Sequence, residues 1–237
     1  MSQKINLSNR LKKVALFLPK GANFADIGSD HAYLPCYVCR QDRVAKAIAG
    51  EVNVGPFNSA KTTVQAYQLS DKIDVRLGDG LQVIEKGEVK QIVIAGMGGP
   101  LIQSILENGK DKLQHVEQII AQPNVDARGV RKWLMAHNFQ LTDEELVEEN
   151  GHFYEIINAT KRHDNSLLNR WTEKELLFGP FLLAKQTSDF YRKWQHEMEK
   201  MTRVINQMKQ ATIRDEKKIT EFERELSWIK EVMNDGN

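Results

Sequence analysis

The sequence has few cysteines, few prolines and no long apolar run. Its 237 residues include 2 Cys and 6 Pro, and no apolar run approaches the roughly 20 residues of a membrane span. The first residues, MSQKINLSNR, lack the hydrophobic stretch of a secretory signal. With 41% hydrophobic and 27% charged residues, we expect a soluble, cytoplasmic, globular protein with one α/β core and residues left for an appendage.

An excess of either charge and a metal-binding cysteine set are also missing. The net charge of +1 excludes a strongly basic protein of the histone kind, although it leaves local basic patches open. Cys36 and Cys39 in PCYVC match half of the zinc deaminase signature, but the H-x-E half is absent upstream of them. Two thiolates with His31 make an incomplete zinc set. We therefore expect no metal, and we expect both thiols to pack a helix against a sheet.

Short apolar runs alternate with helical stretches from residue 23 to about 160. This alternation predicts βαβ units, and hence an α/β fold with a mostly parallel, Rossmann-like sheet. An Asn-Gly turn at 150–151 predicts a hairpin that adds an antiparallel strand at one sheet edge. Ser8 is expected to cap a short first helix, and Pro56 to start a helix within 53–70. The predicted strands are 23–27, 45–51, 72–79, 91–98, 118–124, 145–150 and 152–160.

Glycine and proline are absent between Phe181 and Asn234. Apolar residues recur there in steps of three and four, which predicts two amphipathic helices that pack as an antiparallel coiled-coil hairpin. We expect a sheet domain at 1–160 and a helical domain at 161–237. The predicted seam residues are Phe190, Trp194, Met198, Met201, Ile205 and Met208, then Ile219, Phe222, Leu226, Ile229 and Met233.

The stretch FADIGSDHAYLP, residues 24–35, follows the first predicted strand. In open α/β sheets this loop is a common ligand site, and a phosphate-binding version has the spacing G-x-G-x-x-G. Only Gly28 is present, and the carboxylate of Asp30 would repel phosphate oxygens. A ligand with a positive centre is favoured instead, and S-adenosylmethionine has an ammonium, a sulfonium and no phosphate.

Three further strand ends agree with this ligand. Glu51 can accept both ribose hydroxyls, Asp79 and Gly80 can meet the adenine edge, and the glycines of GMGG at 96–99 allow close backbone approach. The alternative for an acid after a strand is a helix cap. The predicted cofactor-binding residues are Asp26, Gly28, Ser29, His31, Glu51, Val52, Asp79, Gly80, Gly96, Met97 and Gly98.

Several long motifs occur in an order that resembles one family. LSNRLKKVALFLP, ADIGSDHAYLP, AIAGEVNVGPFNSA, RLGDGL, IAGMGG, QPN and GHFYEI together resemble the bacterial tRNA (adenine-N1)-methyltransferases that modify position 22 of tRNA. The likeness covers residues 5 to about 160 and, more loosely, the helical tail. It implies a class I methyltransferase domain with a coiled-coil extension that uses S-adenosylmethionine to methylate N1 of an adenine in the D arm.

Four residues are candidates for the reaction itself. Methylation makes the adenine ring cationic, and Asp30 could stabilise that charge; its alternative is a turn or a cap for a helix beginning near Tyr33. In QPN, Gln122 and Asn124 could hold the base, unless Asn124 or Asp126 caps the next helix. Tyr154 could stack on the base or face the core. His31 could be a neutral hydrogen-bond partner.

Basic residues near these motifs are candidates for RNA binding. Arg128, Arg131 and Lys132 are spaced to share one helix face, with Lys12 and Lys13 on the first helix as further candidates. Arg43 and Lys20 could widen the track. The alternative is an ordinary solvated face.

Rival functions remain open from the sequence. They are a methyltransferase acting on another RNA or on protein, a non-enzymatic RNA-binding scaffold, and a nicotinamide oxidoreductase, which would need the missing glycine fingerprint. We expect tRNA as the partner and no membrane. The oligomeric state is open, with a monomer favoured.

Overall fold

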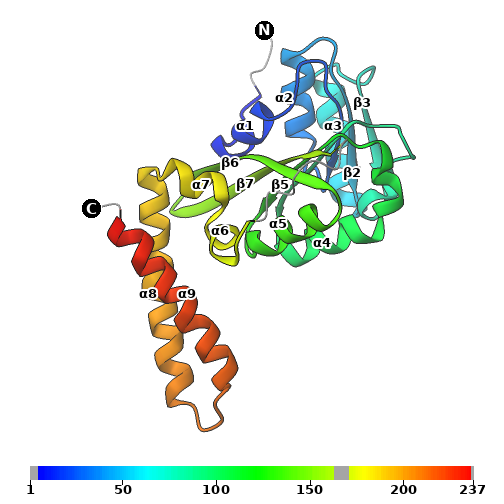
Figure 1. Ribbon diagram of the computed structural model, residues 1–237. Helices are drawn as coiled ribbons and strands as arrows, with labels where there is room; N and C mark the ends of the chain where they lie inside the picture. The colour runs from blue at the N-terminus through cyan, green and yellow to red at the C-terminus, as the bar shows by residue number, and fades with distance from the viewer. Residues whose placement is uncertain (1–4, 163–170, 236–237) are drawn as a thin grey trace. The chain divides into compact units, whose positions relative to one another are not determined.

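The structure is a computed structural model that describes residues 5–162 and 171–235. The chain divides into two compact units, Met1–Asn169 and Arg170–Asn237 (Figure 1). No helix in the described ranges is long and apolar enough to cross a bilayer.

A seven-stranded sheet forms the centre of the first unit. Its order is β3-β2-β1-β4-β5-β7-β6, and β1 to β5 are parallel. The strands are β1 (Asn23–Ile27), β2 (Lys46–Glu51), β3 (Ile73–Leu77), β4 (Gln91–Met97), β5 (Gln118–Pro123), β6 (Phe139–Glu149) and β7 (His152–Lys161). The chain thus forms the predicted mostly parallel Rossmann-like sheet.

The last hairpin differs in detail from the prediction. Asn150 and Gly151 turn the chain with φ of 55° and 79°, as a two-residue type I′ connection requires. The antiparallel strand is β7, which lies between β5 and β6, one place in from the edge. β6 begins at Phe139, well before the predicted residue 145. Phe139 and Leu141 are buried and alternate with exposed Gln140, so this part is a strand with one buried face.

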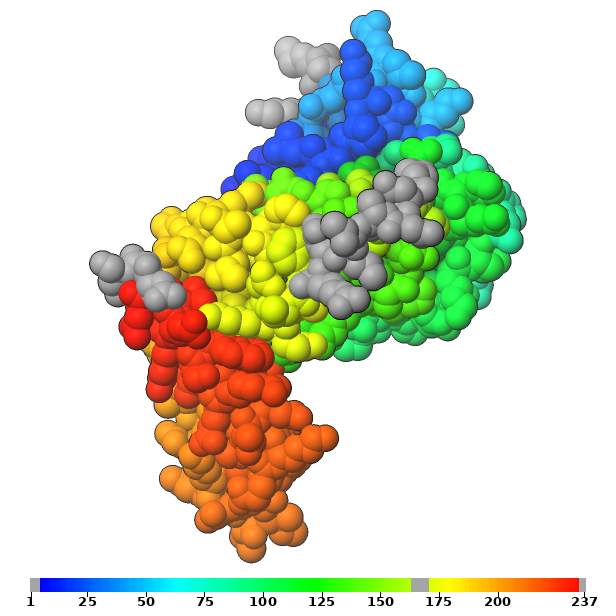
Figure 2. All heavy atoms as spheres, in the orientation of Figure 1, coloured from blue at the N-terminus to red at the C-terminus, as the bar shows by residue number. Residues whose placement is uncertain are grey.

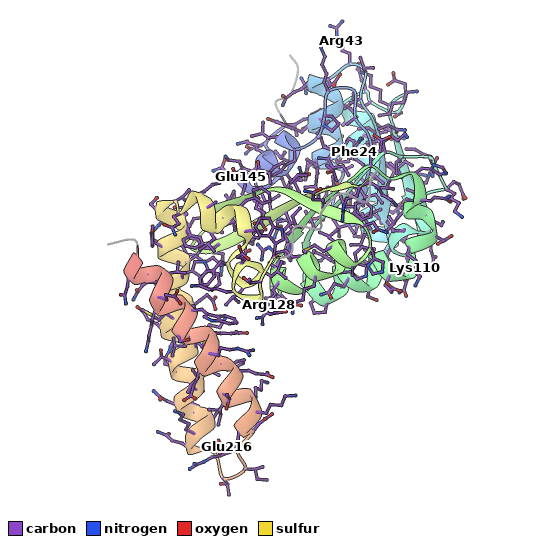
Figure 3. The ribbon with its side chains drawn as sticks, viewed as in Figure 1. Phe24, Arg43, Lys110, Arg128, Glu145 and Glu216 are labelled. Atoms are coloured by element: carbon purple, nitrogen blue, oxygen red, sulfur yellow. The ribbon has the colours of Figure 1, made fainter. Side chains whose placement is uncertain are left out.

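Helices cover both faces of the sheet. On one side α1 (Asn9–Leu16), α2 (Tyr33–Gln41) and α3 (Val54–Ala66) pack in sequence, and on the other α4 (Gly99–Asn108) packs against α5 (Ala127–Ala136) (Figure 1). Short 3₁₀ turns, η1 (Gly80–Val83) and η2 (Lys110–His115), complete the unit. Phe24, labelled in Figure 3, belongs to the core under α1 to α3. Its neighbour Ala25, which is also buried, faces the opposite side because side chains alternate along a strand.

Two local predictions about helices can be compared with the structure. The Ser8 hydroxyl accepts the N–H of Leu11 at 3.2 Å and caps α1. α3 begins at Val54, two residues before the predicted start at Pro56, because proline is tolerated anywhere in the first helical turn.

The described part of the second unit consists of helices and the short segments that join them. It contains α6 (Glu173–Phe178), α7 (Pro180–Lys185), α8 (Ser188–Gln210) and α9 (Glu216–Asp235). α8 and α9 are joined by residues 211–215 and pack along each other, with an ion pair between Lys209 and Glu223 at 2.5 Å. On α9, Val232 is buried where the seam predicted Met233, which is half-buried.

Candidate functional site

The candidate site lies at the carboxyl edge of the parallel strands. β1 and β4 are neighbours, while the chain continues from β1 toward β2 and from β4 toward β5. The loops that follow β1 and β4 therefore diverge, and this switch point is where ligands bind in open α/β sheets. All predicted cofactor-binding residues lie at the ends of β1, β2, β3 and β4 or directly after them.

The loop after β1 has an unusual backbone. Gly28 has φ of +69°, and a Cβ there would collide with the terminal methyl group of Met97. Asp30, His31 and Ala32 follow with φ of 42°, 67° and 57°, although left-handed conformations cost non-glycine residues roughly 1–2 kcal/mol each. The N–H groups of Gly28 and Ser29 both donate to the Gly50 carbonyl, at 2.9 and 3.1 Å. The loop is therefore held in place by β2 and by Met97.

Ala32 precedes α2 and makes no side-chain cap. Asp30 therefore does not cap this helix, which removes one of the two alternatives to its catalytic role. Its side chain is 85% exposed, and Oδ1 lies 3.5 Å from Nε2 of His31.

Two buried carboxyl groups face this loop. Asp26 is 4% exposed and accepts the Ser29 hydroxyl at 2.6 Å. Burial raises the pKa of Asp26 to about 7, with the Ser29 hydrogen bond opposing and nearby Glu51 and Asp30 adding to the rise. Glu51 is 6% exposed and accepts the Asp30 N–H at 2.5 Å. Burial also raises the pKa of Glu51. Such a pair disfavours an anionic ligand and suits a cationic one.

The ends of β2 and β3 add apolar surface beside these acids. Val52 is 59% exposed and Leu77 is 49% exposed, which is unusual for large apolar side chains in one small region. Asp79 is exposed and forms no side-chain cap on η1. Gly80 has φ of +54° and lies against Ile105. Asp79 therefore remains a candidate for ligand contact, because a helix cap does not account for it.

A ring of hydrogen bonds joins β4 to β5. The Gly96 N–H donates to Oε1 of Gln122 at 3.0 Å, Nε2 of Gln122 donates to Oδ1 of Asn124 at 3.1 Å, and Nδ2 of Asn124 donates to the Gly96 carbonyl at 2.8 Å. Met97 accepts the Asn124 N–H at 2.7 Å. Gly98 precedes α4 with no side-chain cap. The cap of α5 is Asp126, whose side chain accepts the Gly129 N–H at 3.0 Å, so Asn124 is not the cap.

Arg10 of α1 joins this ring, although the sequence reading did not select it. An Nη1 hydrogen of Arg10 is donated to Oε1 of Gln122, and the guanidinium carbon lies 5.2 Å from the centre of the Tyr154 ring. The structure thus brings Arg10, Gln122, Asn124 and Tyr154 together. A sequence signal for Arg10 was available in the spacing of the first helix. Arg10 precedes the apolar residue Val14 by four positions and therefore shares its helix face, which is directed inward.

Helix α1 is fixed against the last hairpin. The Asn9 N–H donates to Glu149 at 2.7 Å, and Lys13 pairs with Glu145 at 3.3 Å. Figure 2 shows the dark blue atoms of α1 directly against the yellow-green atoms of β6 and β7. Glu145 is labelled beside α1 in Figure 3.

The prediction that Arg131 contacts RNA is wrong. Its side chain is 0% exposed, and its guanidinium donates to Glu144 at 2.6 Å and to Glu155. The physical reason is that Arg131 lies between Val130 and Leu134 on the face of α5 that is buried against the sheet. Lys132 is exposed and Arg128 half-buried. Arg43 and Arg128 lie at opposite ends of the unit in Figure 3, too far apart for one short basic track.

Cys36 and Cys39 are fully buried in the core under α2. Burial raises the pKa of each thiol to about 12, so neither is a ready metal ligand, because metals bind the thiolate. The described residues contain no cluster of three or more His, Cys, Asp or Glu suited to a metal ion.

Comparisons with known proteins agree with this arrangement. The model of the family described as "TrmK: tRNA (adenine(22)-N(1))-methyltransferase" matches residues 24–231. The tRNA (adenine(22)-N(1))-methyltransferase of Bacillus subtilis strain 168 is 43% identical over 236 residues, which are 98% of this chain and 99% of that protein.

Solved structures of similar proteins give the same result. The crystal structure of B. subtilis TrmK has a TM-score of 0.89 and 42% identity, covering 97% of this chain and 100% of that one. TrmK of M. capricolum, solved with S-adenosyl-homocysteine, has a TM-score of 0.81 and 28% identity, covering 96% and 98%. With its switch-point site and a family match across both units, this chain belongs to the TrmK family of tRNA (adenine(22)-N(1))-methyltransferases.

Proposed function

We propose that this chain transfers the methyl group of S-adenosyl-L-methionine to N1 of adenine 22 in tRNA. The observation that carries the proposal is the loop after β1, where Asp26, Ser29 and Asp30 stand in place of the glycine-lined phosphate site of a dinucleotide enzyme. A nicotinamide oxidoreductase is disfavoured on the same ground. The buried acid at the end of β2, Glu51, suits either kind of enzyme and does not distinguish them. The donor supplies an electrophilic methyl group bound to a sulfonium.

The proposed binding residues follow from the geometry. Glu51 would accept the ribose hydroxyls of the donor, and its charge with that of Asp26 would balance the positive charge of the donor. The loop held by Gly28, Ser29 and Met97 would shape the donor site. The exposed side chains of Val52 and Leu77, with Asp79 beside them, would contact its adenine. Gly80, Gly96 and Gly98 would let the backbone approach. His31 lies next to Asp30 and would act as a hydrogen-bond partner.

The chemistry demands placement more than acid–base catalysis. The N1 lone pair of neutral adenine forms the new N–C bond as the C–S bond of the donor breaks. The electron pair of the broken C–S bond remains on sulfur. No proton leaves N1, so the ring becomes a cation. N1 lies on the pairing edge, so the adenine must be unpaired or flipped out before reaction. Asp30 would stabilise the developing charge, while Gln122, Asn124 and Tyr154 would hold the base at near-attack distance.

The outer surface would contact the rest of the tRNA. Lys12, Lys13, Arg128 and Lys132 are the proposed phosphate contacts, and such contacts make affinity fall with salt. The sequence prediction began the helical domain at residue 161, but Lys161 still belongs to β7. We propose that the second unit is a coiled-coil domain that contacts the tRNA outside the active site. We further propose a monomer that acts in the cytoplasm, where its substrate is found.

Transfer of label from radioactive S-adenosyl-L-methionine to an unmodified tRNA transcript tests the proposal. Mass spectrometry of the nucleosides should give 1-methyladenosine, and a transcript with uridine at position 22 should give none. 6-Methyladenosine, or label in the control transcript, would contradict the assigned atom or position. Binding of tRNA without any transfer would favour the scaffold.

A further inference from the structure

The orientation of the Gln122 amide is fixed by two donors. Both the Arg10 guanidinium and the Gly96 N–H point at the same atom of Gln122. A guanidinium has donors and no acceptor, so the atom it contacts must be the amide oxygen. The amide nitrogen of Gln122 is then directed to Asn124, where it donates to Oδ1 at 3.1 Å.

The orientation of the Asn124 amide follows from that of Gln122. Its Oδ1 accepts from Gln122 and its Nδ2 donates to the Gly96 carbonyl at 2.8 Å. Gln122 is fully buried, whereas Asn124 is exposed. A primary amide has two N–H donors and two oxygen lone pairs. In this ring each polar amide atom of Asn124 makes one hydrogen bond, which leaves one N–H donor and one oxygen lone pair of this exposed amide for a ligand.

A donor beside an acceptor matches one edge of adenine. The N6 amino group and N7 of adenine form an adjacent donor and acceptor, and Asn or Gln amides bind this pair in bidentate fashion. A base held by N6 and N7 keeps N1 free, because N1 lies on the other side of N6. N1 must be free to take the methyl group.

We propose that Arg10 is a positioning and specificity residue that acts through Gln122 to present the Asn124 amide to the N6–N7 edge of the target adenine. The proposal rests on the proposed function. The proposal adds which edge of the base the protein recognises. It also adds which residue fixes the orientation of the amide that recognises this edge. Guanine carries an oxygen acceptor where adenine has its N6 amino group, and that oxygen would face Oδ1 of Asn124 as two acceptors without a hydrogen between them, which disfavours guanine.

The contact of Arg10 depends on neighbouring elements. Gly96 has φ of +81°, which L side chains rarely adopt, and a Cβ there would only be in ordinary contact, 3.4 Å, with Nη1 of Arg10. Glycine is therefore favoured by the backbone conformation that aims the Gly96 N–H at Gln122. The bond from Asn9 to Glu149 and the Lys13–Glu145 pair hold α1 in place. The cation over the Tyr154 ring adds a further contact.

Base analogues at position 22 test the proposal. 7-Deazaadenosine lacks the N7 acceptor and purine riboside lacks the N6 amino group, while both keep N1. For the unsubstituted chain we expect kcat/KM to fall about tenfold with each analogue, the equivalent of one lost hydrogen bond of ~1.4 kcal/mol. A fall of less than twofold with both analogues would overturn the proposal without any variant.

Variants then assign the effect to Arg10. In Arg10→Ala the ratio of kcat/KM for adenosine to that for 7-deazaadenosine should fall about tenfold below its value in the unsubstituted chain, and Arg10→Lys, which restores a donor, should recover part of it. Leu16→Ala, an exposed position on the same helix, serves as the control and should keep the ratio. Comparing this ratio between each variant and the unsubstituted chain cancels the intrinsic reactivity of each analogue.

A second variant guards against loss of activity in Arg10→Ala. Gln122→Glu keeps the acceptor for Arg10 and Gly96 but removes the donor to Asn124, so the ratio should again fall below its value in the unsubstituted chain. An equal loss on all three substrates in both variants would assign Arg10 to phosphate contact or to folding and overturn the proposal. Failure of the proposed function gives a different result, namely no methyl transfer to the adenosine transcript by the unsubstituted chain.

Discussion

At the residue scale, the charge of Glu51 should decide donor affinity. Glu51→Gln keeps the shape and one acceptor for the Asp30 N–H, but it removes the negative charge at a site that is almost fully buried. Losing a charged hydrogen-bond partner costs roughly 1.5–3 kcal/mol. We expect affinity for S-adenosyl-L-methionine, measured by calorimetry, to fall by about 10- to 100-fold.

Glu117→Gln is the matched control. Glu117 pairs with Lys90 at 2.7 Å and lies just before β5, at the opposite edge of the sheet. This variant should bind the donor as the unsubstituted chain does. Equal affinities for both variants would remove Glu51 from the donor site.

Asp26 should make donor binding depend on pH near neutrality. Its pKa is raised to about 7, so the carboxyl group loses its charge as pH falls through that value. Donor affinity should therefore decrease from about pH 8 to about pH 6. Calorimetry across this range checks it, and Asp26→Asn should bind weakly at every pH with a flatter profile.

The raised pKa of Asp26 has the opposite effect on the stability of the free protein, because it makes the free energy of unfolding decrease as pH rises. A raised carboxyl pKa means that the folded state binds the proton more tightly than the unfolded state. Asp26 therefore stabilises the fold less as pH rises from its ordinary value of 3.8 to about 7. In Asp26→Asn this contribution to the pH dependence of urea unfolding should disappear. A profile unchanged by the substitution would contradict the raised pKa.

At the scale of elements, the loop after β1 should not tolerate a side chain at Gly28. Gly28→Ala forces a left-handed conformation on alanine and places a methyl group against Met97. We expect a lower melting temperature and loss of donor binding. Gly151→Ala is the control, because it has a similar φ of +79° with no atom within 4 Å of the added Cβ. In Gly151→Ala the free energy of unfolding should fall only by the cost of the left-handed backbone conformation, about 1–2 kcal/mol.

Met97→Ala in the Gly28→Ala background separates the two causes. Removing the Met97 side chain relieves the collision while the backbone strain remains. Partial recovery of the melting temperature is expected. No recovery at all would mean that the close contact with Met97 does not limit the loop.

The buried cluster of α5, β6 and β7 should be a stability element. Arg131→Met would leave Glu144 and Glu155 without the shared cation that neutralises them. Breaking one partner of a buried ion cluster costs roughly 3–5 kcal/mol. The free energy of unfolding in urea should fall by this amount, whereas Lys132→Met, at the exposed neighbouring position, should change it little. A small effect of Arg131→Met would contradict this assignment.

The elements also show what the sequence could and could not provide. The strand ends and the acids on them were predictable, because apolar runs, turn residues and short acids are local signals. Arg131 was misplaced because charge alone does not say which side of a helix faces the sheet. Arg10 was missed because its partners, Gln122 and Tyr154, are more than a hundred residues away in sequence. The edge position of β6 likewise depends on a pairing between β5 and β7 that no local pattern encodes.

At the scale of the whole molecule, the tip of the α8–α9 hairpin should contribute to tRNA binding. Ile213 is 91% exposed, and Arg214 and Lys217 near it are exposed as well. Reversing both charges, in Arg214→Glu with Lys217→Glu, should weaken tRNA binding and reduce its dependence on salt. Filter binding at several salt concentrations measures both effects, and donor affinity should not change.

Lys86→Glu is the control for this charge reversal. Lys86 is exposed in the loop before β4, at the amino edge of the sheet, opposite the proposed site. It should keep the affinity and the salt slope. If the tip variant binds tRNA as tightly as this control, the helical unit does not contact the tRNA through its tip.

The place of β7 in the sheet has a consequence for synthesis on the ribosome. β7 is the last strand to be translated, yet it fills the position between β5 and β6. Until residue 161 has left the exit tunnel, β5 presents an unpaired edge that can recruit another nascent strand. Tyr154 arrives with the same segment. In a growing polypeptide, β7 therefore completes the sheet and brings the last site residue into place in one step. The exposed edge of β5 needs chaperone protection most just before this step.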